Sequence, residues 1–289
     1  YRAGREGAER FPSSTAKWTH GFEALRMNFA EEALEAHRGI DPDNPAMEGV
    51  AGYWVTLAET LHALERHDEE LREIGKGRER HPENLSLLEA EIRARAALGD
   101  IQEVMALVEE AEVREAEPLE ILRIAALELR AHGHHQVSQE LGERALAYLE
   151  SRSGEVSATI SHRFSVAQTL YRLERWEEAL VIAEELAREA PTNRTYLGFL
   201  GWVAARRGDR QEAERISGEL VAMERLYDHG QPAYIRAKIA SLLGEKEQAV
   251  TLLRQAHDEG RPFTYLHIDM DLEPLRGYLQ FEEFMRPKG

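Results

Sequence analysis

The stretch PTNRTYLGFLGWVAARRGDRQEAERISGEL, residues 191 to 220, decides the fold of this chain. Pro191 breaks a preceding helix and Asn193 can cap the next one, so a helix is expected to begin here. Gly208 separates two runs of apolar and small residues at helical spacing, namely Leu197, Leu200, Gly201 and Ala204 before it and Ala213, Ile216 and Leu220 after it. The stretch therefore predicts two helices that pack as a hairpin across a turn at Gly208.

The same turn recurs along the chain, as glycine or as a polar residue in its place, at Asn28, Glu65, Gly99, Gly133, Glu174, Gly208 and Gly244. Successive subtraction of these numbers gives spacings of 37, 34, 34, 41, 34 and 36 residues. A small residue usually follows five positions later, although Glu70, Val104 and Ser138 stand there in three copies. A glycine seven positions before the turn, Gly21 or Gly201, should let the two helices approach closely. A period near 34 residues is typical of stacked helical hairpins.

The composition agrees with a helical array. The 289 residues are 43% hydrophobic, 31% charged and 7% aromatic, and they are rich in the strong helix formers Ala, Leu, Glu and Arg. We therefore predict an all-α fold of about seven hairpins, in which each hairpin contacts its neighbours.

Several residues resemble the tetratricopeptide repeat (TPR) family. The matching residues are Trp54, Ala58, Leu61 and Pro82 in the second copy, and Ala167, Trp176, Ala179 and Pro191 in the fifth. The resemblance covers about residues 14 to 260, with degenerate individual copies. It implies a right-handed α-solenoid of about seven TPR-like hairpins with a C-terminal cap.

The repeat pattern also suggests boundaries within the chain. We expect a lead-in over residues 1–13, repeats one to four over 14–152, repeats five to seven over 153–260, and a capping segment over 261–289. Residues 152–156 account for the longest spacing and are either a hinge or simply a longer loop, which loop-length statistics favour.

The tail after Gly260, with LHIDMDLEPLRGY followed by FEEFMRPKG, is similar to the ends of TPR arrays that bacteria append to serine/threonine kinases, nucleotide cyclases and transcription regulators. That resemblance implies the partner-binding or sensor part of a bacterial signalling protein. The chain begins at Tyr1 rather than Met, so we expect a fragment or a processed product.

Charge and motifs exclude several classes of function. A net charge of -17 opposes nonspecific nucleic-acid binding. The chain has no cysteine, no apolar run long enough for a membrane span, and no nucleotide-binding or hydrolase motif. We expect no enzymatic activity, no cofactor and no membrane contact from this chain. The compartment stays open, either cytoplasmic or, with a lost upstream signal, periplasmic or extracellular.

Histidines cluster near two of the turns, at His62 and His67 and at His132, His134 and His135. Imidazoles that converge can bind a transition metal, but a hairpin turn is expected to splay its side chains, so we predict structural or solvated roles and no metal. The run His267 to Asp271 offers alternating oxygens but lacks the glycine and glutamate of a calcium loop. A cap with local side-chain turns is the better prediction there.

In TPR proteins the first helix of each repeat lines the concave face, and steps of three and four stay on one helical face. That frame assigns a predicted groove to Trp18, Phe22, Arg26, Arg93, Arg123, Arg130, Phe164, Gln168, Tyr171, Arg172, Trp202, Arg206, Tyr234 and Lys238. The same frame adds only Glu59 and Glu89 as acids, although acids outnumber bases 53 to 36 in the chain.

This basic, aromatic strip favours binding of an acidic or extended peptide, because Arg binds carboxylates through a planar fork and aromatics supply contact area. Pairing of each Arg with a neighbouring Glu is the alternative. The leading hypothesis is thus a non-catalytic protein-interaction scaffold. A structural unit of a homo-oligomer or filament is a second class, and an enzyme with a histidine-bound metal is a third.

Overall fold

The computed structural model describes residues 13–47, 49–114, 118–152, 154, 159–223, 229–264 and 266–288. The rest lies outside the described residues, including most of the predicted lead-in, Tyr265 of the cap, and positions 153, 155 and 156 of the possible hinge.

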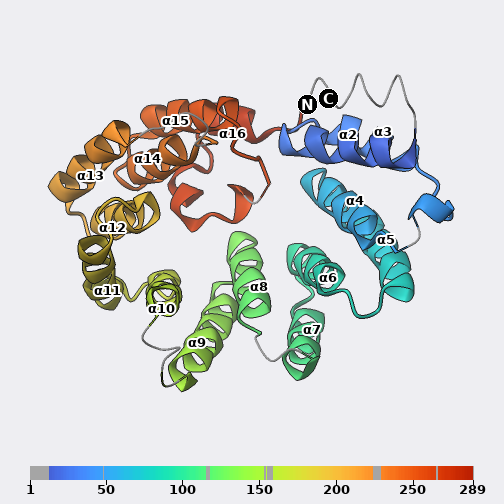
Figure 1. Cartoon of the computed structure of the whole chain (residues 1–289), viewed down its shortest axis with the longest axis horizontal. Coiled ribbons are helices and arrows are strands. Elements are labelled where there is room, and N and C mark those ends of the chain that lie inside the picture. The colour runs from blue at the N-terminus through green and yellow to red at the C-terminus, as the bar shows by residue number, and fades with distance from the viewer. Residues whose placement is uncertain are drawn as a thin grey trace. The chain divides into compact units, whose positions relative to one another are not determined.

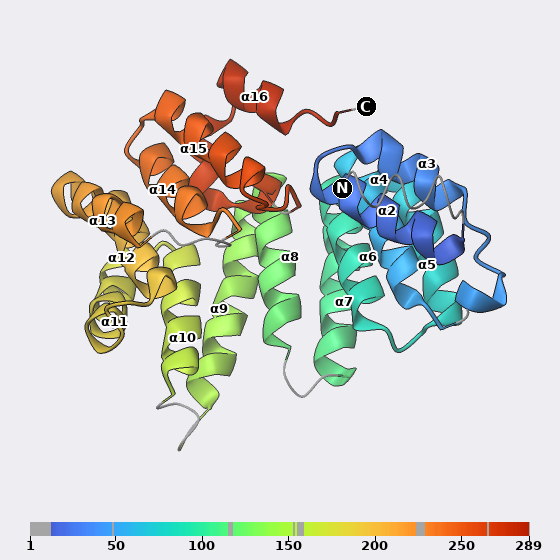
Figure 2. The same ribbon diagram turned by 45° about the horizontal axis from the view of Figure 1, so that its top comes forward.

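Within the described residues the chain is all-helical, without strands, and six pairs of consecutive helices, α2/α3, α4/α5, α6/α7, α10/α11, α12/α13 and α14/α15, pack as hairpins (Figures 1 and 2). The first helices of the repeats are α2 (Ser14–Arg26), α4 (Ala51–Ala63), α6 (Leu85–Leu98), α8 (Leu119–Ala131), α10 (Ile160–Arg172), α12 (Arg194–Arg206) and α14 (Gln231–Leu242). The second helices are α3 (Ala30–Arg38), α5 (His67–Arg80), α7 (Ile101–Arg114), α9 (His135–Ser151), α11 (Trp176–Glu189), α13 (Arg210–Ala222) and α15 (Lys246–Asp258). Short elements complete the chain: η1 (Pro45–Met47), η2 (Leu266–Ile268), η3 (Met270–Leu275) and α16 (Leu279–Met285). The predicted all-α hairpin fold is confirmed.

Each predicted turn residue adopts the left-handed backbone conformation. Gly99, Gly133, Gly208 and Gly244 have φ between +77° and +87°, and the polar replacements Asn28, Glu65 and Glu174 have φ of 64°, 56° and 61°. The second helix of every hairpin then begins two residues later. The left-handed residue ends one helix and reverses the chain into the next, which is why glycine dominates the position.

Asparagine side chains begin two of the first helices, and the cap at Asn193 was predicted. The Asn193 side chain accepts hydrogen bonds from the backbone N–H groups of Thr195 and Tyr196, and Asn84 accepts one from Leu87. Such caps satisfy donors that the first turn of a helix leaves unpaired.

The predicted close approaches at glycine are also present. A Cβ added to Gly201 would lie 3.0 Å from Cγ2 of Ile216 on α13, and one added to Gly21 would lie 2.8 Å from the His37 ring on α3. Only hydrogen fits at these crossings.

The chain divides into two compact units. Unit 1 comprises residues 1–134, 262–266 and 286–289, and unit 2 comprises 135–261 and 267–285. The grouping of the repeats as four plus three about residues 152–156 stays a proposal.

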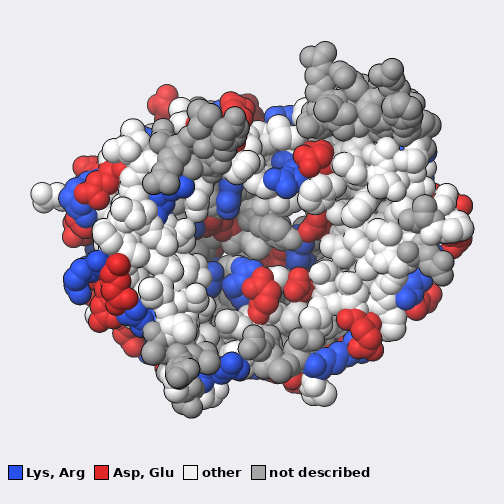
Figure 3. All heavy atoms as spheres, in the orientation of Figure 1, with Lys and Arg blue, Asp and Glu red and all other residues white. Residues whose placement is uncertain are grey.

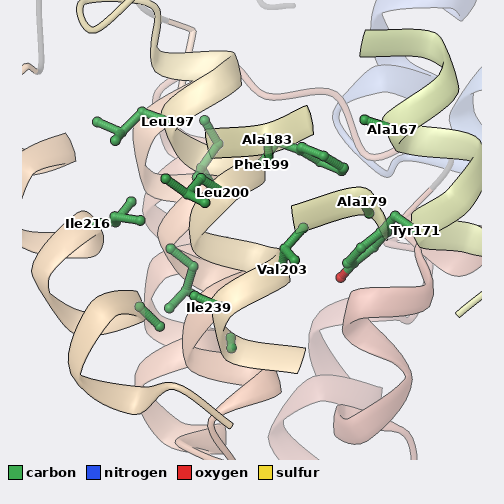
Figure 4. Packing of buried hydrophobic residues seen from close by; sticks show 14 of the residues in the cluster. Ala167, Tyr171, Ala179, Ala183, Leu197, Phe199, Leu200, Val203, Ile216 and Ile239 are labelled. Carbon is green, nitrogen blue, oxygen red and sulfur yellow. The ribbon is translucent and has the colours of Figure 1, made fainter. Parts of the chain in front are cut away.

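Unit 2 has a core that runs through six consecutive helices, α9 to α14. Phe199, Leu200 and Val203 of α12 meet side chains such as Ala183 and Ile216 from the helices on either side (Figure 4). Met270 of η3 joins the same core. The 3-10 segment η3 packs on α14, and α16 packs on α15.

In unit 1 a cluster of buried side chains surrounds Tyr53, Trp54, Leu57 and Leu61 of α4. The two C-terminal stretches of unit 1 bond to the first repeat: Phe263 N donates to Arg26 O at 3.0 Å, and Lys288 N donates to Asn28 O at 2.7 Å. No helix among the described residues is long and apolar enough to cross a membrane.

Candidate functional site

The predicted groove residues of unit 2 come together on the first helices of its repeats. Tyr171 lies near the end of α10, Arg206 ends α12, and Tyr234 and Lys238 lie on α14. In Figure 4 the Tyr171 ring lies beside Ala179 with its hydroxyl oxygen directed away from that residue. We call Tyr171, Arg206, Tyr234 and Lys238 the inner cluster.

Two carboxylates from the C-terminal segment occupy the inner cluster. Lys238 Nζ lies 3.1 Å from Oδ2 of Asp269 and 2.9 Å from Oδ2 of Asp271. Arg206 Nη2 lies 3.0 Å from Oδ1 of Asp271. The Tyr171 hydroxyl donates to Asp271, and the Tyr234 hydroxyl donates to Asp269. Each acid is therefore held by a cation and a phenol.

The backbone of this acidic segment is also held. Arg206 Nη2 donates to the carbonyl oxygen of Met270 at 2.8 Å, and Arg206 Nε donates to the Tyr171 oxygen at 3.2 Å. Asp269 begins η3 and accepts a 3.0 Å hydrogen bond from the N–H of Asp271. The predicted local side-chain turn is thus present at this point of the cap.

Aromatic faces surround the cations. Lys238 Nζ lies 3.5 Å from the centroid of a Trp202 ring, and the Arg261 guanidinium lies 4.3 Å from that of Tyr234. Arg206 is 5.9 Å from the rings of both Tyr171 and Trp176. Such contacts stabilise positive charge where water is scarce.

The charges of the cluster persist despite burial. Burial raises the pKa of Asp271, but the charges of Lys238 and Arg206 and a hydrogen bond from Tyr171 lower it further, leaving it below its usual value. Burial, reinforced by the acids, raises the pKa of Tyr171 and Tyr234 well above the usual range. Burial lowers the pKa of Arg206, but Tyr171 and Asp271 raise it by more, so the net shift of the pKa is upward. At neutral pH Asp271 is therefore ionised and the two phenols keep their protons.

The predicted groove residues of unit 1 are arranged differently. Trp18 donates to Thr56 Oγ1 at 2.9 Å and packs against the α4 cluster, and Phe22 lies 5.6 Å from the Arg26 guanidinium. Arg93 is buried and donates to Glu128 at 2.8 Å, and Arg123 pairs with Glu120. These two arginines satisfy acids of their own unit, as the alternative reading of the sequence anticipated.

The other groove residues of the prediction are partly buried. Phe164 packs edge-on against Tyr196 and Phe199, with ring centroids 5.0 and 5.4 Å away. Arg130, Gln168 and Arg172 lie on the same helices as the residues above, α8 and α10.

Outside the inner cluster, basic side chains of unit 2 pair with acids along the surface. Arg207 contacts Glu177 at 2.8 Å and Arg210 contacts Glu214 at 2.9 Å. Lys/Arg and Asp/Glu atoms accordingly lie side by side along the edge formed by α11 and α13 in Figure 3. These pairs are exposed and contribute little to stability.

The histidines near the turns do not splay as the sequence suggested. His62 and His67 converge on the buried carboxylate of Glu70, and the His132 ring lies 6.5 Å from both. His134 faces Gly99, and His135 is exposed at the start of α9. Burial raises the pKa of Glu70, but hydrogen bonds and charge from the two histidines, with Arg93, bring it below its usual value.

Sequence reasoning missed two parts of these sites. Asp269 and Asp271 were assigned to a cap, and Glu70 was treated as a degenerate copy of a small residue. The special role of Glu70 could have been inferred from the repeat alignment. Glu70 occupies the position at which four other repeats have alanine, and those alanines, Ala33, Ala179, Ala213 and Ala249, are completely buried.

The repeat frame itself has a specific internal pattern. Those four alanines follow their turns by five residues. Seven residues before the turn lies Gly21, Gly201 or a buried alanine such as Ala58 or Ala167. In the repeats that have small residues at both places, the paired helices can cross closely about the left-handed turn. This is the residue pattern by which the sequence resembles the tetratricopeptide repeat family.

Solved structures to which this chain is similar include a tetratricopeptide repeat protein from Parabacteroides merdae, with 15% identity, a TM-score of 0.48, and coverage of 95% of this chain and 99% of that one. MamA AMB-1 has 17% identity, a TM-score of 0.32, and coverage of 60% and 96%. The P58(IPK) TPR domain has 15% identity, a TM-score of 0.32, and coverage of 96% and 82%. No family model and no curated protein matches the sequence significantly. The proposals below rest on this chain's own residues.

Proposed function

We propose that this chain is a non-catalytic interaction scaffold whose inner cluster in unit 2 recognises an acidic, extended peptide segment. One observation carries the proposal: Asp269 and Asp271 are seated among Lys238, Arg206 and two tyrosines. The face that the sequence marked as basic and aromatic thus has the chemistry to hold carboxylates, and residues 269–271 are a tethered stand-in for a partner segment.

The geometry suggests a recognition pattern of acid, apolar residue, acid. Asp269 and Asp271 each take a phenol and share the Lys238 ammonium, and the Met270 side chain between them is buried in the core of unit 2. The hydrogen bond from Arg206 goes to the main-chain carbonyl of Met270, so any residue at that position of a bound peptide could accept it. A partner would need both carboxylates, because a buried cation without its acid is strongly unfavourable.

The wider role that fits this face is the partner-binding or sensor part of a bacterial signalling or regulatory protein. The resemblance of the tail to those of TPR arrays beside kinases, cyclases and transcription regulators supports that context. In this proposal the chain supplies recognition, and chemistry belongs to another domain or protein.

The test uses a fluorescein-labelled peptide of residues 266–277, LHIDMDLEPLRG, added in trans to the full chain. Fluorescence polarisation should show binding to an Asp269→Asn, Asp271→Asn chain, in which the tethered segment is weakened, and weaker binding to the unaltered chain. Added salt should reduce the affinity. A peptide carrying Asn at both acidic positions, and a chain that also carries Lys238→Met, are the matched controls.

Circular dichroism verifies that each variant is folded, and the single Asp269→Asn chain replaces the double variant should the buried Asp271 prove essential. Equal affinity for the acidic and the Asn peptide, or no binding by any folded variant, would show that residues 269–271 are a structural cap and nothing more.

A further inference from the structure

Three possible metal-ligating side chains of unit 1 meet at the turn between α4 and α5. His62 Nδ1 lies 3.1 Å from both carboxylate oxygens of Glu70, and His67 Nδ1 lies 3.0 Å from its Oε2. The two imidazole centroids are 5.0 Å apart. One ligand atom from each residue lies within 4.8 Å of the others. The turn therefore presents two imidazoles and a carboxylate to one point.

The position of Glu70 in the repeat shows that packing does not require it. Five residues after the turn, the other repeats hold Ala33, Val104, Ser138, Ala179, Ala213 and Ala249. Glu70 is nevertheless 1% exposed. An ionised carboxylate buried at a position where other repeats have alanine is unfavourable unless cations or strong hydrogen-bond donors surround it. The site must therefore supply such partners to the Glu70 carboxylate.

A second buried carboxylate stands behind the first group. Glu128 is completely buried, five residues before its turn, where the other repeats have Glu23, Thr60, Ala94, Thr169, Val203 and Ile239. Its Oε2 lies 3.9 Å from His62 Nε2 and 3.8 Å from His132 Nε2, and Arg93 donates to its Oε1 at 2.8 Å. A carboxylate that faces the Nε2–H of an imidazole leaves Nδ1 free to bind a metal and fixes the ring orientation.

The donor set suits a borderline divalent ion. Zinc binds His nitrogen and carboxylate oxygen at about 2.0–2.2 Å in a tetrahedron, which places ligand atoms roughly 3.4 Å apart. The distances from His62 and His67 to Glu70, 3.1 and 3.0 Å, are close to that value, and the ligand atoms of the two histidines lie within 4.8 Å of each other. Small movements would therefore let an ion bind between these groups. We propose that His62, His67 and Glu70 form a binding site for a zinc-class divalent transition metal ion, beside which the His132 ring lies 6.5 Å from both imidazoles.

The experiment titrates Zn²⁺, and separately Co²⁺, into the full chain after removal of bound metal with a chelator. Isothermal titration should show one saturable site, and Co²⁺ should produce visible absorption bands of a four- or five-coordinate ion. Saturating Zn²⁺ should raise the melting temperature, because an ion bound only by the folded state stabilises it.

Glu70→Ala is the decisive variant, since alanine is what four other repeats carry at this position and the hairpin should fold with it. It should abolish the Co²⁺ bands and the Zn²⁺-dependent rise in melting temperature. His20→Gln is the matched control, because His20 Nε2 lies 3.1 Å from Glu32 in a histidine–carboxylate pair of the same unit, and it should leave metal binding unchanged.

Absence of saturable binding by the unaltered chain, or equal binding by the Glu70→Ala chain, would overturn the site. Loss of binding in Glu70→Ala with a normal circular dichroism spectrum supports it. Because this site is in unit 1 and the peptide-binding proposal concerns unit 2, failure of either one is measured separately from the other.

Discussion

Replacing Glu65 by glycine should make the protein more stable, although the substitution removes a whole side chain. Glu65 is exposed and holds a φ of 56°. That conformation costs an L-residue about 1–2 kcal/mol, whereas glycine adopts it freely and loses roughly 0.5–1 kcal/mol through the greater freedom of the unfolded chain. The expected net gain is about 0.5–1 kcal/mol.

Urea denaturation followed by circular dichroism measures the gain. With an m-value near the upper end for small proteins, about 3 kcal/mol/M, the midpoint should rise by roughly 0.2–0.3 M. A fall in the midpoint with an unchanged m-value would refute the argument that backbone strain at the turn limits stability.

Two further substitutions test the same reasoning from other directions. Gly208→Ala should cost about 1 kcal/mol purely through the backbone, because no heavy atom lies within 4 Å of the added Cβ. Asn28→Gly should bring no gain, since the Asn28 side chain donates to the Arg286 carbonyl at 2.9 Å and that bond contributes about 1 kcal/mol. Stabilisation by Asn28→Gly equal to that of Glu65→Gly would show that the side-chain bond contributes nothing.

Two more predictions concern buried groups. Burial lowers the pKa of His37 to about 4, with a smaller opposing effect from the Ala33 backbone. The contribution of neutral His37 to the free energy of unfolding is therefore fully present above pH 6.5 and declines as the pH falls toward 4. Between pH 7 and 5 the free energy of unfolding should fall by about 2 kcal/mol. Urea midpoints at both pH values should show a smaller decline in His37→Gln, and an equal decline would assign the pH dependence to other groups. Gly230→Ala should destabilise by more than the roughly 1 kcal/mol of Gly244→Ala, because its Cβ would lie 2.1 Å from the Ala256 carbonyl oxygen while Gly244 faces open space; equal melting temperatures for the two variants would contradict this.

Much of the fold was predictable because it is periodic. The turn positions depend on local backbone conformation, so Gly99 and Glu174 could be placed in one register although their side chains differ completely. Helix boundaries followed from that register, since each second helix begins two residues after its turn. The assignment of Tyr171, Arg206, Tyr234 and Lys238 to one face used the same register.

What these side chains contact was not predictable in the same way. Asp269 reaches Lys238 because the chain after Gly260 leaves the repeat pattern, and no period constrains its path. Glu70 and His62 were both visible near a turn, but their convergence depends on rotamers and on the crossing of α4 with α5. The pairing of Arg93 with Glu128 joins helices of different repeats, which the sequence does not single out.

The seating of Asp269 and Asp271 has a quantitative consequence for any partner. A segment tethered by a short connection competes at an effective concentration on the order of millimolar. An external peptide that makes only the same contacts therefore displaces it poorly at micromolar concentration. Under the proposed function, the tether would exclude isolated acidic pairs, and only a partner that adds contacts or is itself held nearby would displace residues 269–271.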